Sequence, residues 1–278
     1  MSFTSILVPA LILGGMGLLF GIGLGIAAIK FEVEADPLIP LIREALPGAN
    51  CGGCGYAGCD ALAEAIAKSE AKPTACPVGG AACAAAIGEI MGIPVEPFVR
   101  RRALVRCGGC ESKSNFRYSY VGLNDCKAAM QLAGGGSKSC VYGCLGGGSC
   151  IAACKFGAIS FFDGIAAVDE NKCTACGMCV KSCPKNLIAL VPYNSKQHVL
   201  CNSKDNGKAV RQNCKIGCIG CKLCEKACPT DAVHVQNFLA SIDYEKCVGC
   251  GACAKKCPSR CIEDLQENSN ASASATAL

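Results

Sequence analysis

The fold of this chain is decided by one stretch, Cys247 to Pro258, which reads CVGCGACAKKCP. Its spacing, Cys-x2-Cys-x2-Cys-x3-Cys-Pro, is the ligand run of bacterial iron–sulfur proteins that hold two clusters. Two more copies lie upstream, at residues 173–184 and 218–229. Three copies of so specific a run indicate that the chain binds several [4Fe–4S] clusters and carries single electrons between them.

The spacing has a geometric reason. A loop with two residues between ligands can wrap three thiolates around one face of a cubane, whereas the fourth lies too far along and reaches a partner cluster. In the last two runs this predicts one cluster on Cys218, Cys221, Cys224 and Cys257, and a second on Cys247, Cys250, Cys253 and Cys228.

The cysteine pattern is an internal repeat. Adding 74 to the number of each cysteine from Cys140 to Cys183 gives every cysteine from Cys214 to Cys257 except Cys221. Each unit therefore reads as one module with two cluster motifs. In the first module an ordinary site is predicted on Cys154, Cys173, Cys176 and Cys179.

The second site of the first module departs from the pattern. It has Cys144, Cys150 and Cys183, but Gly147 stands where the second module has Cys221. We expect Cys140 to complete a [4Fe–4S] site there. The alternative is a [3Fe–4S] cluster on three cysteines.

A further cluster is predicted nearer the N-terminus. The block Cys51-x2-Cys54-x4-Cys59-x16-Cys76-Pro supplies four ligands for one [4Fe–4S] cluster, with zinc as the alternative, since four thiolates also suit that metal. The adjacent Ala-rich stretch from Asp60 to Lys68 predicts a helix that packs over this cluster.

The remaining cysteines are harder to assign. Cys107-x2-Cys110 either begins another cluster with Cys126 or consists of structural thiols, and Cys83 and Cys261 are expected to be unligated. The predicted total is about five clusters. The extra candidate ligands are Cys107, Cys110, Cys126, Cys201 and Cys214.

Composition excludes two other classes of protein. The 27 cysteines are odd in number and lie in metal-type groups of a 278-residue chain, which argues against a disulfide scaffold and for a reducing compartment. The formal charge of +5 counts cysteines as neutral. Five clusters at about −2 each would bring the protein to about −5, so the charge does not indicate a nucleic-acid partner.

The N-terminal segment predicts a membrane anchor. No charged side chain occurs from Ile6 to Ile29. About 24 helical residues span ~36 Å, enough to cross a hydrocarbon core of ~30 Å. A signal peptide is the alternative, but no basic region precedes the apolar run. The positive charges that follow place the rest of the chain on the cytoplasmic side of the cell membrane, as a single-pass protein.

The predicted fold class is α+β: an N-terminal transmembrane helix, a small 4Fe-4S domain, and tandem two-cluster ferredoxin-like modules. The short runs Ala232–Val235 and Leu239–Ile242 predict the two strands of a hairpin. The expected domains are 1–30 (anchor), 31–98 (4Fe-4S domain), 99–198 (first module with its lead-in), 199–265 (second module) and 266–278 (disordered tail).

Nothing in the sequence indicates a catalytic residue or a nucleotide site. The glycines of Gly21-x-Gly23-x-Gly25 lie inside the apolar segment, not at a strand–helix turn. Neither His198 nor His234 belongs to a nucleophile constellation. NAD and flavin are therefore expected on other subunits.

Several longer segments resemble one family. The blocks CGGCGYAGC, RYSYVGLNDCKAA, CVYGCLGGGSC, HVLCNSKDNGK and CKIGCIGCKLCEKACP are similar to those of the B-type iron–sulfur component of the Rnf complex, an ion-translocating ferredoxin:NAD oxidoreductase. The resemblance implies an electron-transfer subunit that takes electrons from reduced soluble ferredoxin and relays them to membrane subunits, while the complex moves Na+ or H+. The implied partners are flavin- or NADH-binding subunits, multi-span membrane subunits, ferredoxin and the lipid bilayer.

The direction of transfer is a hypothesis from chain order. The modules on Cys140–Cys257 would receive electrons, and the cluster on Cys51, Cys54, Cys59 and Cys76 would release them. Two rival interpretations are a membrane-tethered polyferredoxin that serves a hydrogenase or formate dehydrogenase, and a zinc-binding scaffold.

Overall fold

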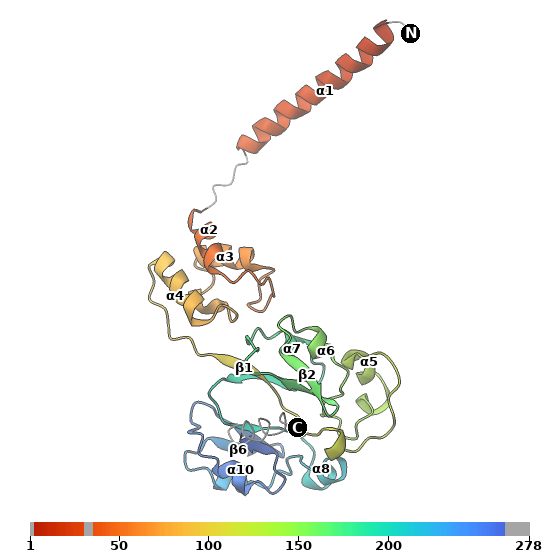
Figure 1. The fold of residues 1–278 in the computed structure, drawn as a ribbon, viewed down its shortest axis with the longest axis vertical. Coiled ribbons are helices and arrows are strands. Elements are labelled where there is room, and N and C mark those ends of the chain that lie inside the picture. The colour runs from red at the N-terminus through yellow and green to blue at the C-terminus, as the bar shows by residue number, and fades with distance from the viewer. Residues whose placement is uncertain (1–2, 31–35, 265–278) are drawn as a thin grey trace, which may run out of the picture.

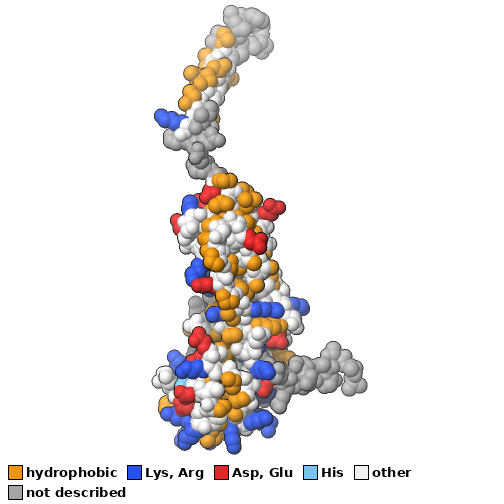
Figure 2. All heavy atoms as spheres, turned by 90° about the vertical axis from the view of Figure 1, so that its left-hand side faces the viewer, with side chains coloured by type: hydrophobic (Ala, Val, Ile, Leu, Met, Phe, Trp, Pro, Cys, Tyr) orange, Lys and Arg blue, Asp and Glu red, His pale blue; other side chains and the backbone are white. Residues whose placement is uncertain are grey.

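The computed structural model describes residues 3–30 and 36–264. Helix α1 (Phe3–Lys30) forms the N-terminal rod in Figure 1. Its apolar side chains are exposed, as Figure 2 shows, with Leu13 and Leu24 each 70% accessible. Among residues whose side chains are described, which in α1 are 11–27 and 30, no helix combines the length and hydropathy of a membrane span. The tail expected at 266–278 lies outside the described residues.

A small helical domain follows. It contains α2 (Leu38–Ala45), α3 (Cys59–Ala67), the 3-10 turn η1 (Pro73–Ala75) and α4 (Gly80–Met91). The predicted helix over Asp60–Lys68 is confirmed by α3. Its alanines favour helix, and Asp60 in the first turn complements the helix dipole.

Branched side chains on facing helices form the core of this domain. Ile42, Leu62, Ile66 and Ile87 are at most 1% exposed and pack with buried cysteines. So few large apolar groups make a thin core, which leaves much of the stability to whatever binds the cysteines.

Between residues 101 and 264, the structure contains four antiparallel pairs of strands. In the first module β1 (Arg101–Val105) pairs with β4 (Ile188–Pro192), and β2 (Ile159–Phe162) with β3 (Ile165–Val168). In the second, β5 (Gln197–Val199) pairs with β8 (Ile262–Asp264), and β6 (Val233–Gln236) with β7 (Leu239–Ile242). The pair β6–β7 confirms the hairpin predicted over Ala232–Val235 and Leu239–Ile242.

The structure repeats with the cysteines. Ile159 lies opposite Val168 in β2–β3, and Val233 lies opposite Ile242 in β6–β7, so both partners are displaced by 74 residues. The short helices α6 (Ser149–Ala152) and α7 (Met178–Ser182) recur as α9 (Leu223–Lys226) and α10 (Ala252–Lys256).

Connecting segments carry the remaining elements. Strand β5 crosses the boundary expected between residues 198 and 199 and pairs with β8. The lead-ins to the modules contain η2 (Glu111–Lys113), α5 (Cys126–Met130), η3 (Ala133–Gly135) and α8 (Gly207–Asn213).

A buried polar group joins the two modules. His198 in β5 is fully buried, with Nδ1 3.0 Å from the Tyr244 hydroxyl and Nε2 2.9 Å from Nη2 of Arg102 in β1. Arg102 also forms a 2.9 Å ion pair with Glu170. Burial, reinforced by the Arg102 charge, lowers the pKa of His198 to about 4, so the imidazole is neutral in the folded protein.

This contact predicts acid sensitivity. An unfolded histidine titrates near pH 6.5, so between that pH and about 4 the unfolded chain binds more protons and stability falls as pH falls. The expected loss is roughly 2 kcal/mol by pH 5. Anaerobic thermal unfolding at pH 7.5 and pH 5 should show a larger drop in Tm for the wild type than for His198→Gln. An equal drop in both proteins would contradict the assignment.

Candidate iron–sulfur centres

All 27 cysteines carry free thiols. The cysteine loops of the two modules share a turn that directs successive thiols toward the same side of the loop. In Cys-x-x-Cys of both modules the residue two after the first cysteine has a left-handed backbone, with φ of 72° at Gly249 and 55° at Ala175. This turn reverses the chain between two ligands, and glycine adopts it without strain whereas alanine does so at a cost.

In the second module the predicted ligands of one cluster line one cavity. Cys218, Cys221, Cys224 and Cys257 surround it together with Cys261. Cys257 thus reaches this site from the neighbouring motif, as the interleaved spacing predicts. The Cys261 thiol donates to Cys218, and together with the backbone N–H groups of Gly220 and Ala240 it lowers the pKa of Cys218 to about 6.

Three cysteines of the other predicted set of this module, Cys228, Cys247 and Cys253, also lie together. Burial raises the pKa of Cys253 to about 11, and the neighbouring Cys247 and Cys228 add to the shift. The backbone N–H of Ala232 donates to Cys228 Sγ at 3.2 Å. Cys250 is exposed and gives this group an open side.

The ordinary site of the first module has a cavity of its own. Cys154, Cys173, Cys176 and Cys179 line it beside Ala103 and Phe156. Two sulfurs accept backbone hydrogen bonds, Cys173 from Ala103 at 3.3 Å and Cys154 from Ala158 at 3.4 Å.

The irregular site of the first module brings in a different cysteine from the one expected. Cys126, the first residue of α5, lies beside Cys150, together with Cys144 and Cys183. Burial, with the nearness of these three sulfurs, raises the pKa of Cys150 to about 12. A Cβ at Gly147 would lie 3.1 Å from Cys126 Sγ.

Cys126 therefore occupies the space that Cys221 fills in the second module. Its N–H donates to Ser149 Oγ at 2.8 Å, which fixes α5 against the loop. Cys140, expected as the fourth ligand, faces another cavity, where Cys107 and Cys214 are its neighbours. The physical reason is that the lead-in chain approaches this site through α5.

Three cysteines of the N-terminal set pack in the core formed with α3 and α4, and the fourth, Cys51, lies near Cys176 of the first module. Cys59 and Cys76 are buried, and Cys54 packs against them. The Cys83 thiol donates to Cys76, and Gly79 donates its N–H to Cys76 Sγ at 3.4 Å. These bonds lower the pKa of Cys76 to about 6.

Seven cysteines remain outside these sets, and Cys83, Cys110 and Cys261 are three of them. Cys83 and Cys261, predicted to be unligated, each donate to sulfurs of a predicted set; Cys261 lies 3.6 Å from Cys257 Sγ. Cys110 is buried in the first module. Its Sγ lies 3.3 Å from Ser112 Oγ, and its thiol forms a hydrogen bond with the Asp163 carboxylate. The alternative set of Cys107, Cys110 and Cys126 is therefore not brought together.

The residues fit iron–sulfur clusters in two respects: thiols line shared cavities, and backbone N–H groups point at their sulfurs, as cluster ligands require. Within the described ranges, no three His, Cys, Asp or Glu side chains are grouped closely enough to hold a single metal ion. This agrees with clusters, because the four thiolates of a [4Fe–4S] site bind different iron atoms of the cage and therefore lie farther apart than the ligands of a single ion.

The N-terminal domain touches the first module at a cluster loop. A Cβ at Gly53 would lie 2.5 Å from the carbonyl oxygen of Cys176. Lys155 Nζ donates to the carbonyl of Asn50 at 3.1 Å. The cysteine loops of two predicted clusters are therefore in direct contact.

Comparison with known families gives the same class. The 4Fe-4S dicluster domain matches residues 139–187, 172–232 and 217–261, and the family described as a putative Fe-S cluster matches residues 46–78. The overlapping windows agree with the interleaved motifs. The chain is thus an iron–sulfur protein with tandem 4Fe-4S dicluster domains.

Similar proteins identify the family. The B component of the Na(+)-translocating ferredoxin:NAD(+) oxidoreductase complex of Acetobacterium woodii is 52% identical over 97% of this chain and 81% of its own length. The B component of an ion-translocating oxidoreductase complex from Methanosarcina acetivorans is 45% identical over 87% and 92%. A proton-translocating relative from Clostridium ljungdahlii is 41% identical over 82% and 81%. The chain belongs to this family, the B components of ion-translocating (Rnf) oxidoreductase complexes.

The position of Cys126 yields a prediction. Cys126→Ala should remove the fourth thiolate of the irregular site and leave a [3Fe–4S] cluster, with about one iron atom fewer per chain. EPR of the oxidised, anaerobically purified protein and iron analysis measure both effects. Cys110→Ala, which removes a buried thiol outside the set, is the control and should change neither. Unchanged iron and EPR in Cys126→Ala would contradict the placement.

Proposed function

We propose that this chain is the electron-transfer subunit of a membrane-bound, ion-translocating ferredoxin:NAD+ oxidoreductase complex. It accepts electrons from reduced ferredoxin and relays them to the membrane subunits. The observation that carries the proposal is the contact between cysteine loops, which connects the modules to the N-terminal domain. A bound [4Fe–4S] cluster supplies the chemistry, since it accepts and releases one electron without making or breaking a bond in a substrate.

Five ligand sets belong to this proposal. The irregular site takes Cys126 in place of Cys140, and the other four keep the cysteines that the spacing predicts. The sets are Cys51, Cys54, Cys59 and Cys76; Cys154, Cys173, Cys176 and Cys179; Cys126, Cys144, Cys150 and Cys183; Cys218, Cys221, Cys224 and Cys257; and Cys228, Cys247, Cys250 and Cys253.

The second module is where a donor would dock. Of the 27 cysteines, all of which the structure describes, Cys221 and Cys250 are the exposed ones. Leu223 and Val248 lie within two residues of these cysteines and are 46% and 66% accessible, and Phe238, which contacts the loop at Gly220, is 53% accessible. An exposed ligand with an apolar surround lets a soluble carrier approach closely, which outer-sphere transfer needs.

Basic side chains gather at the same end. Figure 2 shows them at the end of the molecule opposite α1. Such a surface attracts an acidic partner and speeds its encounter, and soluble ferredoxin is the partner proposed. The exposed basic residues of the second module include Lys222, Lys226, Lys246, Lys255, Lys256 and Arg260.

The N-terminal end is proposed to meet the membrane. The uncharged run Ile6–Ile29 within α1 would cross the bilayer once, with the cluster domains on the cytoplasmic side. In α1 no atom lies within 4 Å of a Cβ built at Gly17, Gly21 or Gly25, which leaves that face open to a neighbouring helix. The proposed neighbours are the multi-span subunits, and the flavin- and NADH-binding subunits would complete the complex.

A complementation experiment tests the function. Membranes that lack this chain should lose ferredoxin-dependent NAD+ reduction, and the wild-type chain should restore it. Cys247→Ser/Cys250→Ser should not restore it, because the proposed receiving cluster is lost. Restoration by this variant, or co-purification with a nickel or molybdenum subunit instead of flavin-bearing partners, would overturn the proposal.

The basic surface predicts a charge effect. Lys255→Glu/Lys256→Glu should raise the KM for ferredoxin about tenfold at low ionic strength and leave kcat nearly unchanged, since these side chains steer the partner without ligating iron. Added salt should reduce the difference. Lys68→Glu, an exposed lysine of the N-terminal domain, is the control and should leave KM unchanged. Equal KM values for the wild type and the double variant would contradict docking at this surface.

A further inference from the structure

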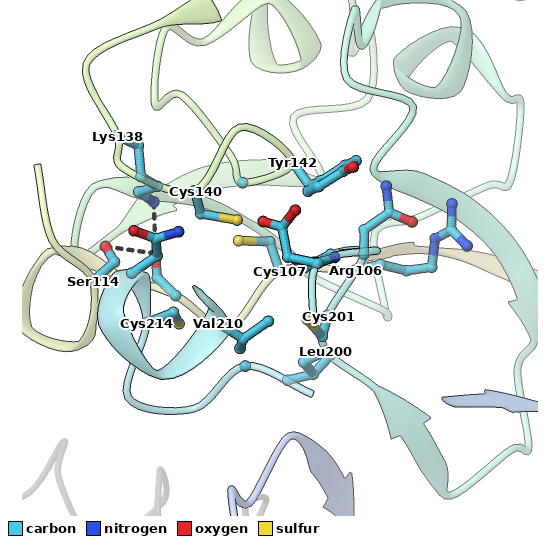
Figure 3. A pocket seen from close by; sticks show the side chains of 17 residues that line it. Arg106, Cys107, Ser114, Lys138, Cys140, Tyr142, Leu200, Cys201, Val210 and Cys214 are labelled. Atoms are coloured by element: carbon cyan, nitrogen blue, oxygen red, sulfur yellow. Dashed lines mark hydrogen bonds between the residues drawn. The ribbon is translucent and has the colours of Figure 1, made fainter. Parts of the chain in front are cut away.

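A cavity between the modules contains four cysteines outside the five sets. Cys107, Cys140, Cys201 and Cys214 line it (Figure 3). They come from four separate segments: the residues after β1, the loop before the first motif, the residues after β5, and the end of α8. No two share a short spacing, so only folding brings them together.

All four sulfurs accept backbone hydrogen bonds. Cys144 donates its N–H to Cys107 Sγ at 3.4 Å. Tyr142 donates to Cys140, Ser203 and Cys218 donate to Cys201, and Ile216 and Gly217 donate to Cys214. Several sulfurs of the other sets, among them Cys76, Cys154 and Cys173, also accept backbone hydrogen bonds, and such bonds stabilise charge on cluster sulfurs.

The backbone also approaches the cavity closely. A Cβ at Gly109 would lie 3.1 Å from Cys214 Sγ and 3.8 Å from Cys107 Sγ. The glycine therefore leaves space at the sulfurs that a side chain would fill.

A buried cation lies at the same place. Lys138 is 3% exposed, and its Nζ donates to the carbonyl of Gly109 at 2.6 Å. Burying an ammonium is costly unless negative charge is near. A cluster held by four thiolates carries a net charge of about −2 and would supply it.

We propose that Cys107, Cys140, Cys201 and Cys214 bind a sixth [4Fe–4S] cluster, which carries electrons from the second module to the first. This transfer role rests on the proposed function. The site adjoins a ligand of each module, because Cys218 donates its N–H to Cys201 and Cys144 donates its N–H to Cys107.

The redox step balances with one electron. An electron arriving from the cluster on Cys218 reduces this cluster from the 2+ to the 1+ state, and its departure to the cluster on Cys144 restores the 2+ state. No proton or covalent bond is transferred. With this site, the series runs from the exposed end of the second module, through the first module, to the N-terminal domain.

Metal analysis of the full-length, anaerobically purified chain tests the site. The wild type should contain about 24 iron and about 24 sulfide ions, against about 20 of each for five clusters. Cys201→Ala/Cys214→Ala should lose about four of each and one reducible centre by EPR. Cys110→Ala, a buried thiol near the cavity but outside the set, should lose none.

Each outcome decides the proposal. Iron near 20 in the wild type, one zinc per chain that the double variant loses, or unchanged iron in the double variant would overturn it. If the double variant does not fold, the wild-type count still decides. These measurements do not depend on the electron donor, so a failure of the proposed function leaves their result intact.

Discussion

The constraint on which this structure depends is that four thiolates must converge on one small cage. Each domain has few large apolar side chains, and its cysteines are part of its core: Cys59 and Cys76 pack among Ile42, Leu62 and Ile66, and both modules follow the same plan. Left-handed turns, short helices and N–H groups directed at sulfur all serve this convergence. Metal binding and folding are therefore coupled in this protein.

Convergence across segments also explains how the domains connect. Within a module, the fourth cysteine of each motif crosses to the neighbouring site, so two sites cannot separate without unfolding. Between domains, contacts occur at the ligand loops themselves, as where the position of Gly53 meets Cys176. Contact between ligand loops shortens the path of an electron, and the buried Arg102–His198 contact holds the two modules at a fixed separation.

Prediction from sequence succeeded where spacing is local. The β6–β7 hairpin, helix α3, the 74-residue repeat and the grouping of Cys218, Cys221, Cys224 and Cys257 all follow from short-range patterns. The spacing of Cys107-x2-Cys110 left open whether these residues are ligands or structural thiols, and in the structure the Cys110 thiol turns to Ser112 and Asp163. The glycine at position 147 showed that the irregular site lacks one ligand of the usual run. No local feature of the sequence indicated that Cys126 takes its place.

The sequence by itself determined that this chain is an iron–sulfur protein with two interleaved modules and an apolar N-terminal segment, because a thiolate run of that spacing can wrap a cubane almost regardless of its surroundings. Only the tertiary structure decided which distant cysteines meet. Cys126 reaches the irregular site, and Cys107, Cys140, Cys201 and Cys214 share a cavity, because α5, α8 and the ends of β1 and β5 pack at the junction of the modules. These contacts between distant cysteines depend on packing between segments far apart in the chain, and local spacing does not encode that packing.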